Sequence, residues 1–181
     1  MTSEQSQVVP KPAKYDPAKI VGLISDTHVP TRARRIPEKV FKIFENAEFI
    51  IHAGDLVELS VIEELEQIAP VLAVSGNMDS SDIKEKLQQI DSLRLCNWKI
   101  GVMHDPGAHF GAKKMKAIAE KHDFDVLVYG HTHNSNVKWG GNILFINPGS
   151  PTNPIPPFIV KPSVALLKIT KDEIKQEIIQ I

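Results

Sequence analysis

Residues that can bind metal ions fall in five short blocks of this chain, and most of the blocks directly follow an apolar run rich in β-branched residues. Carboxylate, amide and imidazole groups are ligands that divalent transition metals accept. Because strand ends are where an α/β sheet presents its ligands, we expect the five blocks to meet in space. The candidate ligands are Asp26, His28, Asp55, Asn77, His104, His131 and His133. The pattern predicts a hydrolytic centre with two divalent cations.

The spacing within the blocks suggests how the ligands are shared. Asp26 and His28 are two residues apart, so in an extended chain both side chains face the same way and one cation could take both. Asp55 follows a glycine that permits a tight turn, and its two carboxylate oxygens suit a bridge between two cations. His131 and His133 are also two apart, but a sharp loop there could send them to different cations.

The apolar periodicity predicts a chain that alternates strands and helices and then becomes rich in strands. Strands are predicted at residues 20–24, 49–51, 71–74, 93–95, 100–103, 126–129, 143–146, 164–169 and 174–181. Helices are predicted at 37–47, 61–69, 83–90 and 115–122. The segment 97–99 is expected to be a hairpin turn, and 147–162 a proline-rich loop.

The order of these elements predicts an α/β fold. A β-α-β-α-β first half implies parallel strands with right-handed crossovers, and the second half implies antiparallel or mixed pairing. Two facing mixed sheets with helices outside would bury the apolar residues, giving a four-layer α-β-β-α sandwich. Residues 20–181 are expected to form a single domain. Residues 1–19 are polar and proline-rich without an apolar core, so we expect a flexible tail and not a secretory signal.

Composition excludes several classes of function. The 181-residue chain has a net charge of −1, and its pI of about 6.7 gives no basic surface of the kind that binds nucleic acid. No apolar run approaches the roughly 20 residues of a membrane span, so no membrane insertion is expected. Cys96 is the single cysteine, which suits a reducing compartment, and we expect a cytoplasmic protein. The sequence does not decide whether the protein forms a homo-oligomer.

The ordered blocks resemble those of the calcineurin-like metallophosphoesterase superfamily, in particular its small prokaryotic phosphodiesterase branch. The likeness covers about residues 20–181. It is carried by Ile24-Ser25-Asp26-Thr27-His28, His52-Ala53-Gly54-Asp55, Gly76-Asn77-Met78-Asp79, Gly130-His131-Thr132-His133 and Asn147-Pro148-Gly149-Ser150, together with His104. The resemblance implies hydrolysis of a small phosphodiester or other phosphate ester. The expected cofactors are two divalent ions, with manganese as the first choice and nickel, cobalt, iron or zinc as alternatives.

The resemblance also implies a role for each ligand. One metal would be held by Asp26, His28, Asp55 and His133, and the other by Asp55, Asn77, His104 and His131. Two metals about 3.5–4 Å apart can share an acidified hydroxide that attacks phosphorus in line. Asp55 would bridge the metals and Asn77 would help to hold the charged phosphoryl oxygens. The two aspartates would neutralise only part of the charge of two divalent cations. The remaining positive charge suits a phosphate group.

The chain departs from the wider family at two positions. Many members carry a histidine as general acid where this chain has Met78, which cannot donate a proton. Asp79, which would orient that histidine, is then expected to have a structural role. Protonation of the leaving group falls to water or to an imidazole such as His109, which a glycine-rich loop could turn inward or leave in solvent. The second departure is Asp105 after His104, where relatives often have glycine.

Other polar residues have ordinary structural explanations beside the functional ones. His52 lies in an apolar strand and is expected to be buried near the centre, and His122 ends a helical stripe. The basic group Arg32, Arg34 and Arg35 could grip phosphate, but a solvated basic turn is the favoured interpretation. Turn chemistry alone explains the segment 147–150, although it could line the site.

The alternative to an enzyme is a catalytically weak or inactive scaffold. A retromer subunit of eukaryotes is similar in fold and is regarded chiefly as an interaction protein. The presence of all seven ligand types, including four histidines, favours the enzyme. A nuclease is disfavoured because no extended basic stripe is present, although a small nucleotide substrate is not excluded.

A first prediction concerns the proton donor. Replacing Met78 with histidine (Met78→His) should raise activity on esters with poor leaving groups, because it restores a side chain that can donate a proton. The measurement is the ratio of alkyl to aryl phosphodiester hydrolysis in the variant and in the unaltered protein. An unchanged ratio would place Met78 away from the leaving group.

Overall fold

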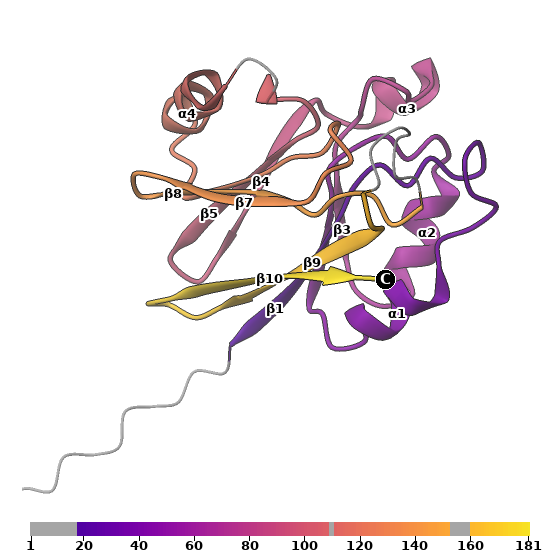
Figure 1. The fold of residues 1–181 in the computed structure, drawn as a ribbon, viewed down its shortest axis with the longest axis horizontal. Helices are drawn as coiled ribbons and strands as arrows, with labels where there is room; N and C mark the ends of the chain where they lie inside the picture. The colour runs from indigo at the N-terminus through magenta and orange to yellow at the C-terminus, as the bar shows by residue number, and fades with distance from the viewer. Residues whose placement is uncertain (1–17, 109–110, 153–159) are drawn as a thin grey trace, which may run out of the picture.

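A computed structural model describes residues 18–108, 111–152 and 160–181, which form two facing β-sheets with helices outside (Figure 1). Residues 1–17 of the predicted tail and His109 lie outside the described residues. Each sheet has five strands and is mixed, as predicted. The fold is therefore the expected α/β sandwich.

The first sheet has the order β10-β9-β1-β2-β3, with parallel pairing among β1, β2 and β3 and antiparallel pairing at β9 and β10. Its strands are β1 (Lys19–Ile24), β2 (Phe49–His52), β3 (Val71–Ala73), β9 (Ser163–Ile169) and β10 (Ile174–Gln180). The helices between the parallel strands are α1 (Glu38–Phe44) and α2 (Ser60–Glu66). They provide the crossovers that parallel strands require.

The second sheet has the order β4-β5-β6-β8-β7, with parallel pairing of β5, β6 and β8 and antiparallel strands at both edges. Its strands are β4 (Ile90–Leu95), β5 (Trp98–Met103), β6 (Val126–Val128), β7 (Asn136–Gly140) and β8 (Ile143–Asn147). Two more helices, α3 (Ser81–Lys86) and α4 (Ala112–Lys121), precede β4 and β6. In this sheet the three central strands are the parallel ones.

Alternation along the strands divides the core into layers. Leu23 and Ile51 belong to the apolar cluster between the two sheets, which β5, β6 and β8 also enter. Their neighbours Ile24 and Ile50 pack on the other face, against α1 and α2. On the second sheet, Leu127 faces away from the first sheet and packs against α4. This arrangement gives the four layers α-β-β-α.

All three parallel strands of each sheet end near the same edge. In the first sheet, Ile24 is in register with His52, and His52 with Ala73. In the second sheet, Val128 is in register with both Val102 and Ile146. The loops that follow these residues therefore meet, and they carry the five blocks.

The local structure departs from the sequence predictions at three places. Ile90 begins β4 and does not belong to the third helix, because its backbone pairs with Met103. The predicted hairpin exists, but its turn ends before Trp98, which is the first residue of β5. Strand β7 was not predicted, because Asn136–Gly140 is mostly polar; it is an exposed edge strand paired with β8.

Candidate metal centre

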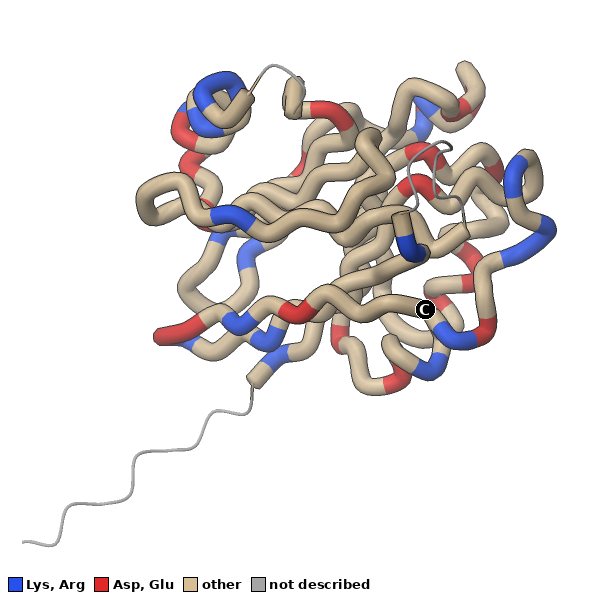
Figure 2. The backbone as a smooth tube through the Cα atoms, viewed as in Figure 1, with Lys and Arg blue, Asp and Glu red and all other residues tan. Residues whose placement is uncertain are grey.

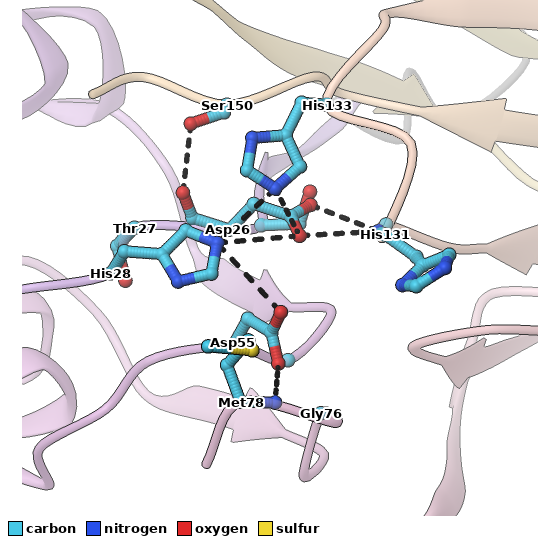
Figure 3. Close-up of polar contacts among 12 residues, drawn as sticks. Asp26, Thr27, His28, Asp55, Gly76, Met78, His131, His133 and Ser150 are labelled. Carbon is cyan, nitrogen blue, oxygen red and sulfur yellow. Dashed lines mark hydrogen bonds and ion pairs between the residues drawn. The ribbon is translucent and has the colours of Figure 1, made fainter. Parts of the chain in front are cut away.

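The seven candidate ligands converge at the shared edge of the two sheets. Figure 3 shows the rings of His28 and His133 on one side of the Asp26 carboxylate, with His131 on its other side and Asp55 below. Two sets of buried groups have ligand atoms within 4.8 Å of one another and could hold a cation. One set is Asp26, His28 and His133, and the other is Asp26, Asp55 and His104.

The first set is tightly spaced. Nε2 of His133 lies 3.2 Å from Nε2 of His28 and 3.3 Å from Oδ1 of Asp26. A cation about 2.0–2.1 Å from each atom would hold neighbouring ligand atoms about 2.8–3.4 Å apart in octahedral or tetrahedral geometry. The observed spacing therefore fits a shared cation.

The second group of ligands has the same spacing around the Asn77 amide oxygen. That oxygen lies 2.9 Å from Nε2 of His104 and 2.9 Å from Nδ1 of His131. Oδ2 of Asp55 lies 3.3 Å from Nε2 of His104. Thus His131 faces Asn77 while His133 faces Asp26, so the two histidines point to different groups.

Asp55 connects the two groups through one oxygen. Its Oδ2 is 3.7 Å from Nε2 of His28 and 3.3 Å from Nε2 of His104. Its other oxygen, Oδ1, accepts a hydrogen bond from the Met78 backbone N–H at 2.8 Å. A fixed orientation of this kind leaves Oδ2 directed between the groups.

Five of the seven candidate ligands have left-handed backbone conformations. They are Asp26, His28, Asp55, His131 and His133, with φ values of 53°, 46°, 58°, 69° and 56°. The chain is therefore not extended at Asp26 and His28, although their ligand atoms still meet in one group with His133. Non-glycine residues seldom adopt positive φ, and such strain clusters at functional sites. Backbone pairing of the loops, from Asp26 N–H to Gly54 C=O at 3.0 Å, holds them there.

Two glycines next to ligands allow close approach between blocks. A Cβ at Gly76 would lie 2.1 Å from Oδ1 of Asp55, and a Cβ at Gly130 would lie 2.7 Å from Oδ2 of Asp26. In each case the glycine beside one ligand contacts a ligand of another block. Any larger residue would push the groups apart.

Asp79 holds two of the loops in place. Its carboxylate accepts backbone N–H bonds from Asp55 at 3.1 Å, Val57 at 2.7 Å and Gly76 at 2.7 Å. The expected structural role is thus seen in its contacts, which reach both the Asp55 loop and the Asn77 loop. A buried carboxylate satisfied in this way fixes the backbone around Asp55.

The segment after β8 supports the loop that carries His131 and His133. The Asn147 side chain donates to the Gly130 carbonyl at 2.9 Å and accepts from the Gly149 N–H at 2.8 Å. Ser150 donates to the Asp26 carbonyl at 2.8 Å. The segment 147–150 therefore lines the back of the centre and is more than a turn.

Histidine tautomers are set by backbone groups. Nδ1 of His104 lies 2.8 Å from the Ala53 carbonyl, which can only accept, so Nδ1 carries the proton and Nε2 faces Asn77 and Asp55. Such an arrangement is typical of metal-binding histidines. In His52, Nδ1 accepts from the Gly54 N–H at 3.2 Å, so Nε2–H donates to the Thr27 hydroxyl at 3.1 Å. His52 is thus buried beside the centre, as expected.

Burial dominates the electrostatics. It raises the pKa of Asp26 and lowers the pKa of His28 to about 4 and that of His52 to about 3. Burial also opposes ionisation of Asp55 and His104, but their mutual hydrogen bond and charges outweigh it. The pKa of Asp55 is therefore lowered and that of His104 is raised. Nδ1 of His28 is buried without a hydrogen-bond partner among the described residues.

The remaining sequence candidates lie around this centre. The Met78 side chain is 53% exposed beside Asp55, so a side chain there borders the site. His122 caps the C-terminus of α4, and its ring stacks on that of Phe124 at 5.3 Å. The basic turn at 32–35 is exposed, and Arg35 pairs with Glu38 at 3.3 Å.

Sequence reasoning missed Lys84. Its ammonium group donates to the Asn77 backbone carbonyl at 2.9 Å, and no sequence motif marked it.

Comparison with known proteins agrees with this geometry. The model of the calcineurin-like phosphoesterase superfamily domain matches residues 20–172. A probable metallophosphoesterase of Methanothermobacter thermautotrophicus is 37% identical over 166 residues, covering 89% of this chain and 92% of that protein. The phosphodiesterase MJ0936 of Methanocaldococcus jannaschii is 34% identical over 145 residues, covering 71% and 82%.

A solved structure shares the fold. Vps29 of Entamoeba histolytica, crystallised in complex with Zn²⁺, superposes with a TM-score of 0.74 and 26% identity, covering 89% of this chain and 98% of that chain. No helix within the described part of the chain has the length and apolar character needed to span a bilayer. Two mixed sheets, buried Asp and His groups able to bind metal, and the matched family model lead to one conclusion. The chain belongs to the calcineurin-like phosphoesterase superfamily.

Proposed function

We propose that this protein is a metal-dependent phosphodiesterase with a dinuclear centre. The observation that carries the proposal is the spacing of the ligand atoms, 2.9–4.0 Å between neighbouring atoms of each group, with Oδ2 of Asp55 facing both groups. Membership of a phosphoesterase family and the similarity to a protein named as a phosphodiesterase support it. Residues 20–181 are taken as the single catalytic domain.

The proposed ligand sets follow the two groups. Asp26, His28, Asp55 and His133 hold one cation, and Asp55, Asn77, His104 and His131 hold the other. The donors are mixed nitrogen and oxygen atoms, which manganese, iron, cobalt, nickel and zinc all accept. Manganese is our first choice, and zinc is supported by the similar Vps29 complex.

When bound, two divalent cations supply a hydroxide nucleophile at neutral pH and stabilise charge on a phosphoryl group. The protein's own part is to hold the ligands in fixed positions. Asp79 and Asn147 fix the loops from behind, and the Ala53 carbonyl accepts a hydrogen bond from Nδ1–H of His104, which leaves Nε2 as the ring nitrogen directed at the centre. The Asn77 side chain would also orient the phosphoryl oxygens.

Leaving-group protonation falls to water or to His109, which lies outside the described residues. Met78 borders the centre and cannot donate a proton. Since the Met78 position supplies no general acid, leaving groups that are stable as anions are favoured. Activated aryl diesters are therefore expected to turn over faster than alkyl monoesters.

A scaffold on the same fold is the second candidate function. The structural similarity to Vps29 is the observation that favours it. Proteins of one fold can have different functions, so a scaffold is compatible with this fold. Turnover separates the two candidates. Hydrolysis of bis-p-nitrophenyl phosphate by the protein with manganese, lost on chelation, supports the enzyme. No turnover with manganese, nickel, cobalt or zinc would support the scaffold.

A second prediction tests the shared carboxylate. Asp55→Asn should lower bis-p-nitrophenyl phosphate turnover by more than about 100-fold and reduce metal content at both positions, because its Oδ2 faces both groups. Turnover and metal content by mass spectrometry are the measurements. Asp172→Asn, at an exposed turn, is the matched control and should behave as the unaltered protein. Near-normal turnover of Asp55→Asn would remove Asp55 from the centre.

A third prediction uses the close approach of Gly76. Gly76→Ala should weaken metal binding strongly, because the added Cβ would lie 2.1 Å from Oδ1 of Asp55. Calorimetric titration with Mn²⁺ is the measurement. Gly141→Ala serves as control, since its φ of 71° makes alanine strained but nothing lies within 4 Å of the added Cβ. That variant should lose about 1 kcal/mol of stability and keep its metal affinity. Equal metal affinity in both variants would contradict the prediction.

A fourth prediction concerns pH. A protonated His104 ring cannot bind a cation through Nε2, and its pKa is raised above the ordinary 6.5. Protons therefore compete with the metal below that raised pKa, so affinity should fall as the pH is lowered through it. His28, with its pKa near 4, does not contribute in this range. Mn²⁺ titrations at several pH values measure the effect. His122→Gln should leave the profile unchanged, and a flat profile would refute the role of His104.

A further inference from the structure

A groove of about 1370 Å³ opens beside the candidate metal centre, lined largely by α4 and β7. His131 and Thr132 line it, and His131 also contacts the Asn77 amide oxygen at 2.9 Å. A molecule in the groove would therefore reach the centre directly. Its volume exceeds the roughly 300–1,000 Å³ of a pocket for a drug-sized ligand. The groove is larger than a simple diester needs.

The groove is positively charged. Four lysines line it: Lys113 and Lys116 on α4, Lys138 on β7, and Lys161 before β9. None of the described residues lining it carries a carboxylate, although the chain as a whole has a net charge of −1. Figure 2 shows basic segments on α4 and on β7 below it. This local excess of positive charge suits an anion.

The rest of the lining suits an uncharged ring or sugar. Met115, Tyr129 and Phe145 are nearly buried and contribute apolar and aromatic surface to the groove. Asn134 and Ser135 add neutral hydrogen-bonding groups in the loop between His131 and β7. Aromatic surface with a few polar groups is typical of small-molecule sites.

We propose that this groove binds the part of the substrate beyond the scissile phosphate, and that this part carries a second phosphate-type anion. The proposal rests on the proposed function, because the scissile phosphate is taken to lie at the candidate metal centre. The lysines hold the second anion, and the apolar and polar lining contacts the moiety between the two charges. The preferred substrate is then an extended phosphodiester with a charged end. Bis-p-nitrophenyl phosphate lacks that end.

The test compares two probes that differ by one phosphate: a dinucleoside monophosphate with and without a terminal phosphate. The protein with Mn²⁺ should show the higher kcat/KM on the phosphorylated probe. The double variant Lys113→Gln and Lys138→Gln should lower that preference by about tenfold or more, since a hydrogen bond to a charged group is lost at each position. Turnover of bis-p-nitrophenyl phosphate should not change.

Lys121→Gln is the matched control, because Lys121 is exposed on the same helix but does not line the groove. It should keep the preference. Equal kcat/KM for the two probes in the unaltered protein would overturn the proposal, and so would a preference that survives in the double variant. In either case, turnover of bis-p-nitrophenyl phosphate would leave the proposed function standing.

A binding measurement keeps the two proposals separate. With metals chelated, the unaltered protein should bind the phosphorylated probe at least about tenfold more tightly than the double variant does. If bis-p-nitrophenyl phosphate is not hydrolysed with any metal, the proposed function fails, and this comparison still judges the groove. Equal binding by both proteins would overturn the groove proposal.

Discussion

The crowding of polar atoms in a buried space is the constraint on which this structure depends. Carboxylate, amide and imidazole atoms lie 2.9–3.3 Å apart in a region where burial raises the pKa of Asp26 and lowers that of His28. Asp26 and His28 are therefore held where their charged forms are disfavoured by lost solvation. Five of the ligands also have left-handed backbones, each of which costs about 1–2 kcal/mol. A bound cation is the natural compensation for such an arrangement.

The two sheets explain how the crowding is sustained. Parallel strands place their carboxyl ends at one edge, and the register brings three strand ends of each sheet to the same level. Loops at those ends would diverge without further support. Asp79 ties the loop of Asp55 to that of Gly76, and Asn147 ties the segment after β8 to Gly130. The ligands thus sit on braced loops and not on free ones.

The sequence predicted the candidate ligands, their order and the strand ends that carry them, because most of the blocks follow an apolar run. It also predicted the layered sandwich, because apolar residues recur at a different spacing along a strand than along a helix. The left-handed turns at Asp26 and His28 were not predictable, because they arise from pairing with residues 54 and 55. Strand β7 was not predicted, because an edge strand exposed to solvent needs no alternation of apolar and polar residues. The three N–H groups bound by Asp79 come from loops that meet only in the folded chain. The role of each ligand toward a metal stays a prediction.

The origin of the ligands has a consequence for the mechanics of the fold. Asp26, Asp55 and Asn77 follow strands of one sheet, while His104, His131 and His133 follow strands of the other. Otherwise the two sheets meet mainly through apolar side chains. Ions that took ligands from both sheets would act as inorganic cross-links across the interface between the sheets. The melting temperature would then rise with the metal concentration, because any species that binds only the folded chain stabilises it by mass action.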